Sequence, residues 1–320
     1  MTSSHSASRG EAAPPSADAR SKFVEAAHPS RRWIVTAVVA AALLICVYVI
    51  AVLTPWGQRW ENAALTGSGR ASPDEQAQAL DALAAIQIWS LAVALAGIAV
   101  IGLLRRQILT TIVALAVVLG GAGGAEVLKR WVLPRPELFA APVDLIQNSF
   151  PSGHTAIAMT TMVAVFLVVP YRWRGWAMFI VMTWATSIGQ YTVTAHWHRL
   201  SDTVGADLMA LILGSVAAYW LHRRGLVHVS EQRRYGGRVV YVVVATILGL
   251  VSLALGTLLA WVSIDQELAS GSGDHNAFLA TQVLAGAFST AAALVYWATW
   301  HRLEITGSSE LAIDGHSRRP

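Results

Sequence analysis

Three short segments of the chain carry basic, hydroxyl and histidine side chains in patterns suited to phosphate chemistry. They read KRWVLPRP at 129–136, SFPSGH at 149–154 and HWHRLSD at 196–202. Arginine presents a planar fork that matches phosphate oxygens, and lysine adds a compact positive charge. Histidine gains and loses a proton near neutral pH, so it can serve as a nucleophile, an acid or a base. Together the three segments predict a site that binds phosphate and reacts with it.

The pair His198 and Asp202 could form a catalytic nucleophile and its orienting carboxylate. The two residues are four positions apart, so on a helix they would share one face. The Asp202 carboxylate would then accept the Nδ1 proton of His198 and leave Nε2 exposed as a nucleophile. This is the orienting logic of a catalytic triad, with histidine as the attacking group.

A second histidine, His154, follows a turn that favours the start of a helix. Ser152 and Gly153 should lie at that start, where backbone amides bind anions and glycine permits close approach. His154 could donate a proton to a leaving oxygen. Lys129 and Arg135 would neutralise the negative charge of the transition state.

The composition places these segments in a membrane protein. The 320 residues are 55% hydrophobic and 13% charged, with a mean hydropathy of +0.51. Soluble domains carry roughly a quarter charged residues, so half that fraction with long apolar runs indicates an integral membrane protein. The formal net charge of +4 does not suggest a nucleic-acid partner. The single cysteine, Cys46, excludes an intrachain disulfide.

Eight apolar stretches could cross a bilayer as helices, which predicts an all-α polytopic membrane bundle. They cover about 33–53, 84–104, 108–128, 155–169, 175–194, 203–221, 239–262 and 278–300. The first 30 residues are rich in Ser, Ala and Pro and are expected to form a disordered tail. A polar loop is expected at 55–83, and a polar tail after His301.

Charged residues between these stretches predict the orientation of the bundle. Arginines cluster in the loops on one side, whereas the loops at 55–83 and 264–276 are rich in acid. By the positive-inside rule, the arginine-rich loops and both termini are cytoplasmic in a multi-pass protein of the cell membrane. Lys129, Arg135 and Arg199 then lie on the outer face with the two histidines. A bound phosphate would explain why basic residues occur there.

Three other features bear on the site or on helix packing. Glu126 and Asp207 fall within or near apolar stretches, where a carboxylate is costly. Either could hold helices together or line the site, and the sequence does not decide between these roles. The glycine-rich stretch 120–124 should let another helix approach closely, since no Lys-Ser/Thr pair follows it as in a phosphate loop.

The three segments resemble the signature motifs of the PAP2 (type 2 phosphatidic acid phosphatase) superfamily, which includes lipid phosphate phosphatases. The sequence PSGH at 151–154 matches the second motif in full. The spacing from His198 to Asp202 matches the end of the third motif. The resemblance covers about 105–221, and the order of the motifs and of the apolar stretches fits the family.

Two positions depart from the family pattern. The first motif, at 129–136, has five residues between its Lys and its Arg-Pro, where six are usual. The third motif usually begins Ser-Arg, and this chain has Tyr191 and Thr192 there. The family's third-motif arginine is therefore missing. Arg199 and His196 are nearby basic residues that could replace it.

The resemblance implies a phosphatase that works through a phosphohistidine intermediate. His198 would attack phosphorus, Asp202 would orient it, and His154 would protonate the leaving group and then activate water. The groups expected to hold the phosphate oxygens are Lys129, Arg135, Ser152, Gly153 and Arg199. The family requires no metal, and no cofactor is expected. A site on the outer face near the membrane surface suits a lipid phosphate or diphosphate.

The resemblance also divides the chain into parts. A six-helix PAP2-like core would occupy 31–225, and two additional transmembrane helices would occupy 226–302, between tails at 1–30 and 303–320. A non-catalytic relative, acting as a transporter or scaffold, and a lipid phosphotransferase remain open as alternatives. The sequence does not determine which lipid phosphate is bound, what the last two helices do, or the oligomeric state.

Overall fold

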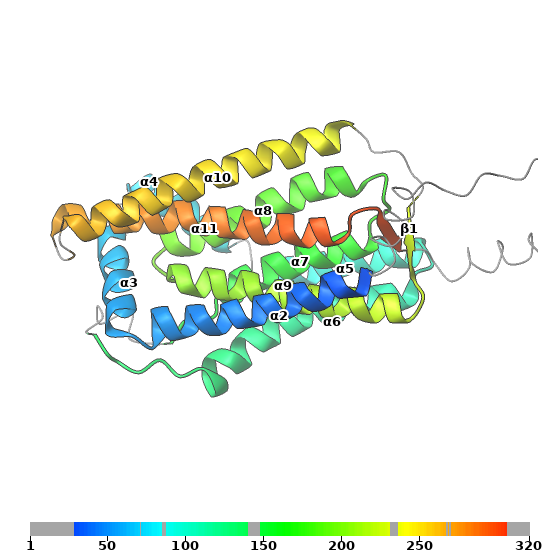
Figure 1. Ribbon diagram of the computed structural model, residues 1–320, viewed down its shortest axis with the longest axis horizontal. Coiled ribbons are helices and arrows are strands. Elements are labelled where there is room, and N and C mark those ends of the chain that lie inside the picture. The colour runs from blue at the N-terminus through cyan, green and yellow to red at the C-terminus, as the bar shows by residue number, and fades with distance from the viewer. Residues whose placement is uncertain are drawn as a thin grey trace, which may run out of the picture.

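The fold is a bundle of long helices that run roughly side by side (Figure 1). The computed structural model describes residues 29–70, 72–84, 88–139, 148–230, 236–266, 268 and 270–305. The helices are α2 (Pro29–Val47), η1 (Tyr48–Val52), α3 (Pro55–Ser68), α4 (Pro73–Ala84), α5 (Ile88–Leu104), α6 (Ile108–Val127), η2 (Leu128–Val132), α7 (Gly153–Val168), α8 (Arg174–Thr194), α9 (Leu200–Arg223), α10 (Gly236–Asp265) and α11 (Gly271–Thr299). The strands are β1 (Val227–Val229) and β2 (Leu303–Ile305).

The long apolar stretches of the sequence form the helices that make up this bundle. Each of the eight predicted stretches overlaps a helix, and residues 85–87 of the second stretch lie outside the described residues. Among the residues that the structure describes, five helical segments are long and apolar enough to cross a membrane: Ser30–Val52, Ile108–Val132, Leu200–Arg223, Arg238–Asp265 and Gly271–Thr299. Shorter apolar segments occur in α5 and form α7. The prediction of an all-α membrane bundle is therefore confirmed.

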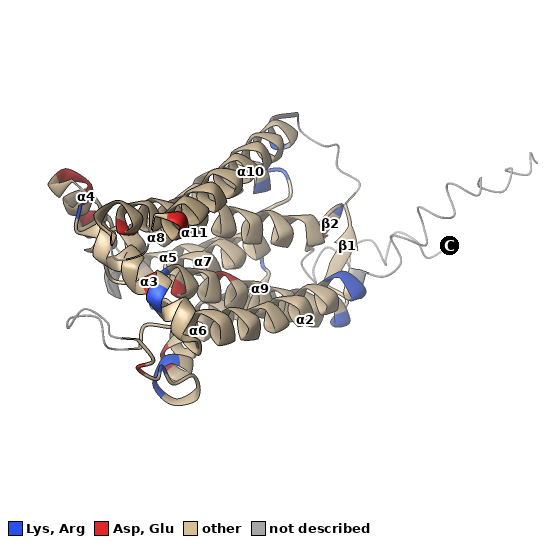
Figure 2. Cartoon of the chain, turned by 60° about the vertical axis from the view of Figure 1, so that its left-hand side comes forward, with Lys and Arg blue, Asp and Glu red and all other residues tan. Residues whose placement is uncertain are grey.

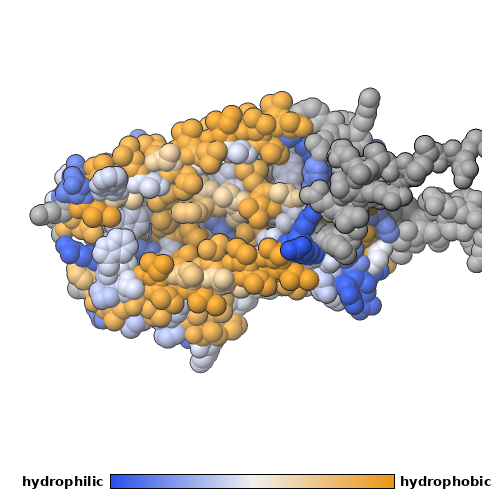
Figure 3. Space-filling view, in the orientation of Figure 1, coloured by the Kyte–Doolittle hydropathy of each residue, from blue (hydrophilic) through white to orange (hydrophobic). Residues whose placement is uncertain are grey.

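Helix α9 lies at the centre of the bundle, and α10 lies at its edge. α9 packs against α2, α6, α7 and α11, and 67% of its most apolar 18-residue stretch is buried. α10 packs mainly on α11, and only 11% of its own most apolar 18-residue stretch is buried. Its exposed valine and leucine side chains contribute to the apolar surface in Figure 3. Apolar surface of this extent suits contact with lipid.

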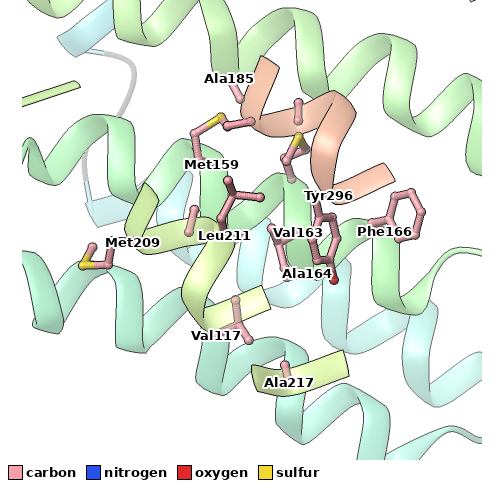
Figure 4. Close-up of a cluster of buried hydrophobic side chains, with 14 of the residues drawn as sticks. Val117, Met159, Val163, Ala164, Phe166, Ala185, Met209, Leu211, Ala217 and Tyr296 are labelled. Carbon is pink, nitrogen blue, oxygen red and sulfur yellow. The ribbon is translucent and has the colours of Figure 1, made fainter. Parts of the chain in front are cut away.

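The interior is filled by apolar side chains from α7, α9 and α11. Figure 4 shows Met159, Val163 and Phe166 of α7 in one cluster with Leu211 of α9 and Tyr296 of α11. The rings of Phe166 and Tyr296 meet edge to face, with centroids 5.4 Å apart, which is a favoured aromatic arrangement. This core fixes α7 and α9 relative to each other. The same two helices begin at the predicted site residues.

The glycine-rich stretch of α6 lets α7 approach closely, as predicted. A Cβ atom on Gly121 would lie 2.6 Å from the Cγ2 and Oγ1 atoms of Thr160 on α7. The Thr160 hydroxyl donates a hydrogen bond of 2.6 Å to the Ala156 carbonyl, so the side chain is held in place. Gly123, on the same helix, has no atom within 4 Å of its would-be Cβ.

The expected polar loop at 55–83 is wrong, because this region contains helices α3 and α4. Thr54 caps α3 by accepting a hydrogen bond of 3.0 Å from the Gly57 amide, and Pro55 occupies the first helical position, where proline is favoured. Asp74 and Glu75 lie in the first turn of α4, where they complement the helix dipole. α3 crosses one end of the bundle in Figure 1.

The last two helices hold α3 in place. A Cβ atom on Gly67 of α3 would lie 1.9 Å from the Asp274 carbonyl oxygen of α11, so only glycine allows this contact. The Trp60 indole of α3 donates a hydrogen bond of 3.2 Å to the Ser263 hydroxyl of α10. Arg70, just after α3, donates to the Gly271 carbonyl. α10 and α11 are therefore joined to the helix that crosses the end of the bundle.

A small antiparallel sheet joins the segments that follow α9 and α11. β1 lies in the expected basic linker and β2 begins the expected C-terminal tail, with Val227 paired to Ile305. The buried Arg174 donates a hydrogen bond of 2.8 Å to the Leu303 carbonyl. Residues 1–28 of the expected disordered tail lie outside the described residues. The part of the expected C-terminal tail at 306–320 lies outside them as well. The proposed domain boundaries stay predictions.

The contact at Gly121 yields a stability prediction. We expect Gly121→Val to destabilise the protein by about 1–3 kcal/mol, because the added methyl groups would overlap Thr160 in a close-packed contact. The measurement is the thermal unfolding midpoint in detergent. Gly123→Val is the matched control, with the same change of residue and open space around it. Equal midpoints for the two variants would contradict this account of the contact between α6 and α7.

Candidate active site

His198 and Asp202 form the predicted pair at the start of α9. The Nδ1 atom of His198 lies 3.2 Å from the Asp202 Oδ2 atom, and both side chains are buried. An ionised carboxylate only accepts hydrogen bonds, so this contact places the imidazole proton on Nδ1 and leaves the lone pair on Nε2. The same Oδ2 atom accepts the Arg199 amide at 2.9 Å. Asp202 therefore orients the histidine and caps its own helix.

A tight turn between α8 and α9 places His198 at this position. The backbone amides of Trp197 and His198 both donate to the Thr192 carbonyl, each at 3.1 Å. His196, in the turn, has a φ of 61°, in the left-handed region that few residues other than glycine adopt. The chain thus reverses direction within a few residues and begins α9 at Leu200.

The second segment reaches the same place through the start of α7. The Ser152 hydroxyl accepts a hydrogen bond of 3.3 Å from the Thr155 amide and caps the helix. The Ser152 amide donates to the Asp202 carbonyl at 2.9 Å, which ties the starts of α7 and α9 together. The His154 ring lies across from His198, with ring centroids 6.3 Å apart. Two imidazoles at this separation can act on the same bound group from different sides.

Lys129 of the first segment lies near His154 and is held by two contacts. Its ammonium group lies 3.1 Å from the Glu126 Oε1 atom, and its backbone carbonyl accepts a hydrogen bond of 2.8 Å from the Asn148 side-chain Nδ2 atom. A Cβ atom on Gly153 would lie 3.7 Å from that same Glu126 oxygen. Glu126 is therefore beside the start of α7, and of the two roles left open for it the geometry favours lining the site.

Arg135 is a buried guanidinium group with donors available for an anion. Its side chain is 5% exposed, and its Nη2 atom lies 3.7 Å from the Glu61 Oε2 atom. Neither Nη1 nor Nη2 has a hydrogen-bond partner in the described residues. Buried donors without partners are costly, so an oxyanion within their reach would be bound strongly.

Arg199 directs its guanidinium group toward residues of the second segment and of α3. Its guanidinium donates to the Ser149 hydroxyl at 3.1 Å and to the Asn62 carboxamide oxygen at 3.3 Å. Burial lowers the pKa of Arg199, and the Asp202 carboxylate opposes that change. Thr192, at the position of the missing family arginine, is buried and donates to the Gly189 carbonyl at 2.8 Å. Of the two candidates for replacing that arginine, Arg199 is the one that these hydrogen bonds join to Ser149 and Asn62.

Glu61 and Asn62 of α3 are the site residues that the sequence reasoning missed. The Glu61 Oε1 atom accepts the Ser201 amide at 3.0 Å, and the carboxylate is 3% exposed. These residues lie on a helix where a loop was expected. The signals that could have found the helix are the capping Thr54 and the proline that follows it. Charged residues gather at this end near α3 and beyond the end of α6 (Figure 2).

Asp207 serves helix packing rather than the site. It lies within α9, and its Oδ2 atom accepts a hydrogen bond of 2.8 Å from the Ser289 hydroxyl of α11. The contact joins two membrane-spanning helices through a buried polar pair, as is common between helices in lipid. Of the two roles left open for Asp207, the structure supports holding helices together.

Burial of Glu61 yields a pH prediction. Burial raises the pKa of the Glu61 carboxyl above its ordinary value of 4.5, with a smaller opposing effect from Arg135 and Arg199. A raised pKa stabilises the fold below that ordinary value, and this stabilisation is lost as the pH rises through the folded-state pKa. The thermal midpoint of the wild type should therefore fall relative to that of Glu61→Gln between pH 4.5 and neutrality.

The control for this experiment is Glu137→Gln, an exposed residue of the segment after η2. It reports how far the loss of one exposed carboxyl alters the thermal midpoint at each pH. If the difference between Glu61→Gln and the wild type followed pH in the same way as that between Glu137→Gln and the wild type, the prediction would be contradicted.

Comparison with known proteins gives one family. A family model described as the PAP2 superfamily matches residues 36–226, which include all three segments of the site. No curated protein and no solved structure matches the chain. Among the described residues, no group of three or more His, Cys, Asp or Glu side chains is arranged to hold a metal ion.

Proposed function

The chain belongs to the PAP2 superfamily, and from this premise we propose that it hydrolyses lipid phosphates or diphosphates through a phosphohistidine intermediate. The observation that carries the proposal is the His198–Asp202 contact of 3.2 Å, with the His154 ring across from it. The superfamily generally comprises phosphatases. An oriented nucleophile and a second histidine are the two groups that this chemistry needs.

The reaction proceeds in two displacements. The Nε2 lone pair of His198 forms a bond to phosphorus while the bond from phosphorus to the lipid oxygen breaks, and His154 gives its proton to that oxygen. Water then attacks the phosphohistidine, His154 takes a proton from the water, and the bond between nitrogen and phosphorus breaks. Inorganic phosphate leaves, and both histidines return to their initial states. Asp202 stabilises the positive imidazole ring of His198 in both steps.

The phosphate oxygens bind to basic side chains and to backbone amides. Arg135 and Arg199 offer guanidinium donors, and Lys129 adds charge from the side of His154. The start of α7 at Ser152 and Gly153 contributes the positive end of a helix dipole. The burial of Arg199 and its contacts with Ser149 and Asn62 support the proposal that it does the work of the missing third-motif arginine.

A lipid substrate is favoured by the location of the site. His154 and His198 lie at the ends of apolar helices of a membrane bundle, where a lipid headgroup can reach them while its chains stay in the bilayer. The distribution of arginines along the chain supports an orientation in which this end is on the outer face of the cell membrane, with both termini cytoplasmic. The protein would then act in lipid metabolism of the cell envelope.

Two alternatives use the same site differently. A non-catalytic relative would have no need for the His198–Asp202 contact or for buried guanidinium donors, and both are present. A phosphotransferase would share every step up to the phosphohistidine and then use a lipid alcohol in place of water. Product analysis with candidate acceptor lipids distinguishes transfer from hydrolysis.

The role of His198 is tested by phosphate release from a panel of lipid phosphates and diphosphates. We expect His198→Ala to lower the rate by at least about 1,000-fold, because loss of a nucleophile removes the main reaction path. The assay is run in EDTA, where wild-type release should continue because arginine and lysine supply the positive charge. Asparagine tolerates a left-handed φ, so His196→Asn is a control that should stay active. Release by folded His198→Ala at the wild-type rate would exclude the proposed mechanism.

The role of Arg199 is tested by a pair of substitutions. We expect Arg199→Gln to lower kcat/KM by about 100-fold or more, as removal of one oxyanion donor does in other enzymes. Arg199→Lys should recover part of this loss, because it keeps the charge without the planar fork. The inhibition constant for orthovanadate, a phosphate analogue, should rise in parallel. Arg130→Gln, at a side chain 69% exposed, is the control, and a loss as large there would argue against a specific role for Arg199.

A further inference from the structure

We propose that the protein binds an anionic, two-chain phospholipid around Arg238, at the end of the bundle away from His198. α8 begins at Arg174 and ends at Thr194 near the active site, so its length separates the two places by about 30 Å. The proposed site is independent of the catalytic mechanism. It rests on two grooves, a shared arginine and the charge around it.

Two grooves run along the first half of α10 and meet at Arg238. One has a volume of about 640 Å³ and lies between α8 and α10, with Trp176, Phe179 and Val244 among its walls. The other, of about 410 Å³, lies between α10 and α11, with Val243 and Leu294 among its walls. Both grooves are lined by Arg238 and are otherwise largely apolar. One cationic group at the junction of two apolar grooves matches a headgroup that carries two acyl chains.

Arg238 is held in an orientation that leaves a donor unused. Its guanidinium carbon lies 4.4 Å from the Tyr171 ring centroid and 5.3 Å from that of Trp297, within the range of cation–π attraction. Its Nη1 atom is buried and has no hydrogen-bond partner in the described residues. Gly175 allows α8 to come close, since a Cβ atom there would lie 3.5 Å from the Arg238 Cβ.

The charge around the grooves is positive. Arg172 lines the first groove and Arg302 the second, and no Asp or Glu is among the described residues that line either one. Arg174 is buried, and its guanidinium carbon lies 5.6 Å from the centroid of the Tyr171 ring that Arg238 also contacts. The nearby carboxylate, Glu304, accepts a hydrogen bond of 3.0 Å from Ser230. Basic residues, blue in Figure 2, lie beside the strands and at neighbouring helix ends, so an anion would be attracted here.

The walls favour a membrane lipid over a soluble anion. α10 is largely exposed along a span apolar enough to cross a membrane, and the surface over it is apolar in Figure 3. The exposed Trp173 and Trp176 lie beside the arginines, as tryptophan does at membrane interfaces. Basic pockets between transmembrane helices bind the headgroups of anionic lipids. A phospholipid satisfies both the apolar grooves and the cation between them.

The test is native mass spectrometry of the full-length protein in detergent, with dioleoyl phosphatidylglycerol or dioleoyl phosphatidylcholine added. The wild type should retain one phosphatidylglycerol in preference to phosphatidylcholine. Arg238→Gln should lower that retention by about fivefold, and Arg172→Gln by a smaller factor, as expected for the loss of one charge near an anionic headgroup. Arg172 is exposed, so its variant reports on binding even where Arg238→Gln is poorly folded.

The matched control is Arg223→Gln, which removes an exposed arginine at the same end but outside both grooves. It should retain phosphatidylglycerol like the wild type, and so should wild-type protein saturated with orthovanadate. Equal retention of phosphatidylcholine, or an equal loss in Arg223→Gln, would show attraction without a specific site. Displacement by orthovanadate would place the lipid in the active site. If Arg238→Gln and Arg172→Gln both retained phosphatidylglycerol as well as the wild type does, the proposal would also be overturned.

Discussion

The geometry of the candidate site depends on Asp202. Its side chain orients His198 and caps the first turn of α9, and its carbonyl accepts the amide of Ser152. One residue therefore fixes the orientation of the His198 ring and joins the starts of two helices that lie far apart in sequence. Because α7 and α9 also share the apolar core, the separation of His154 and His198 is set by helix packing and not by flexible loops.

Buried charge is the constraint that explains the surroundings of this pair. Glu61, Arg135, Arg199 and Asp202 are largely removed from water, and isolated charges in such a position are costly. Their mutual contacts offset part of that cost. α3 contributes the buried Glu61 and Asn62, which bond to Ser201 and Arg199, so it is as much a part of the site as the three sequence segments are. The Arg135 donors have no hydrogen-bond partner in the described residues. An oxyanion that bound them would offset a further part of that cost.

The sequence predicted the spanning helices because a membrane helix needs a long apolar run and little else. It also predicted that His154, His198 and Asp202 meet, since their segments flank helices that return to one end. It did not predict α3 or its contribution, because Glu61 and Asn62 look like ordinary loop residues and gain their role only from tertiary contacts. The involvement of Arg199 likewise depends on its hydrogen bonds with Ser149 and Asn62, which spacing along the sequence does not specify.

The contact between Gly67 and Asp274 has a consequence for how the chain is divided. The family resemblance ends at residue 226, yet α3, inside that range, is seated against a helix that begins at Gly271. The last two helices therefore support the end of the bundle that holds the candidate site. The segment that matches the family is smaller than the set of helices that shapes the site. α10 and α11 therefore cannot be exchanged for other helices without affecting the position of α3.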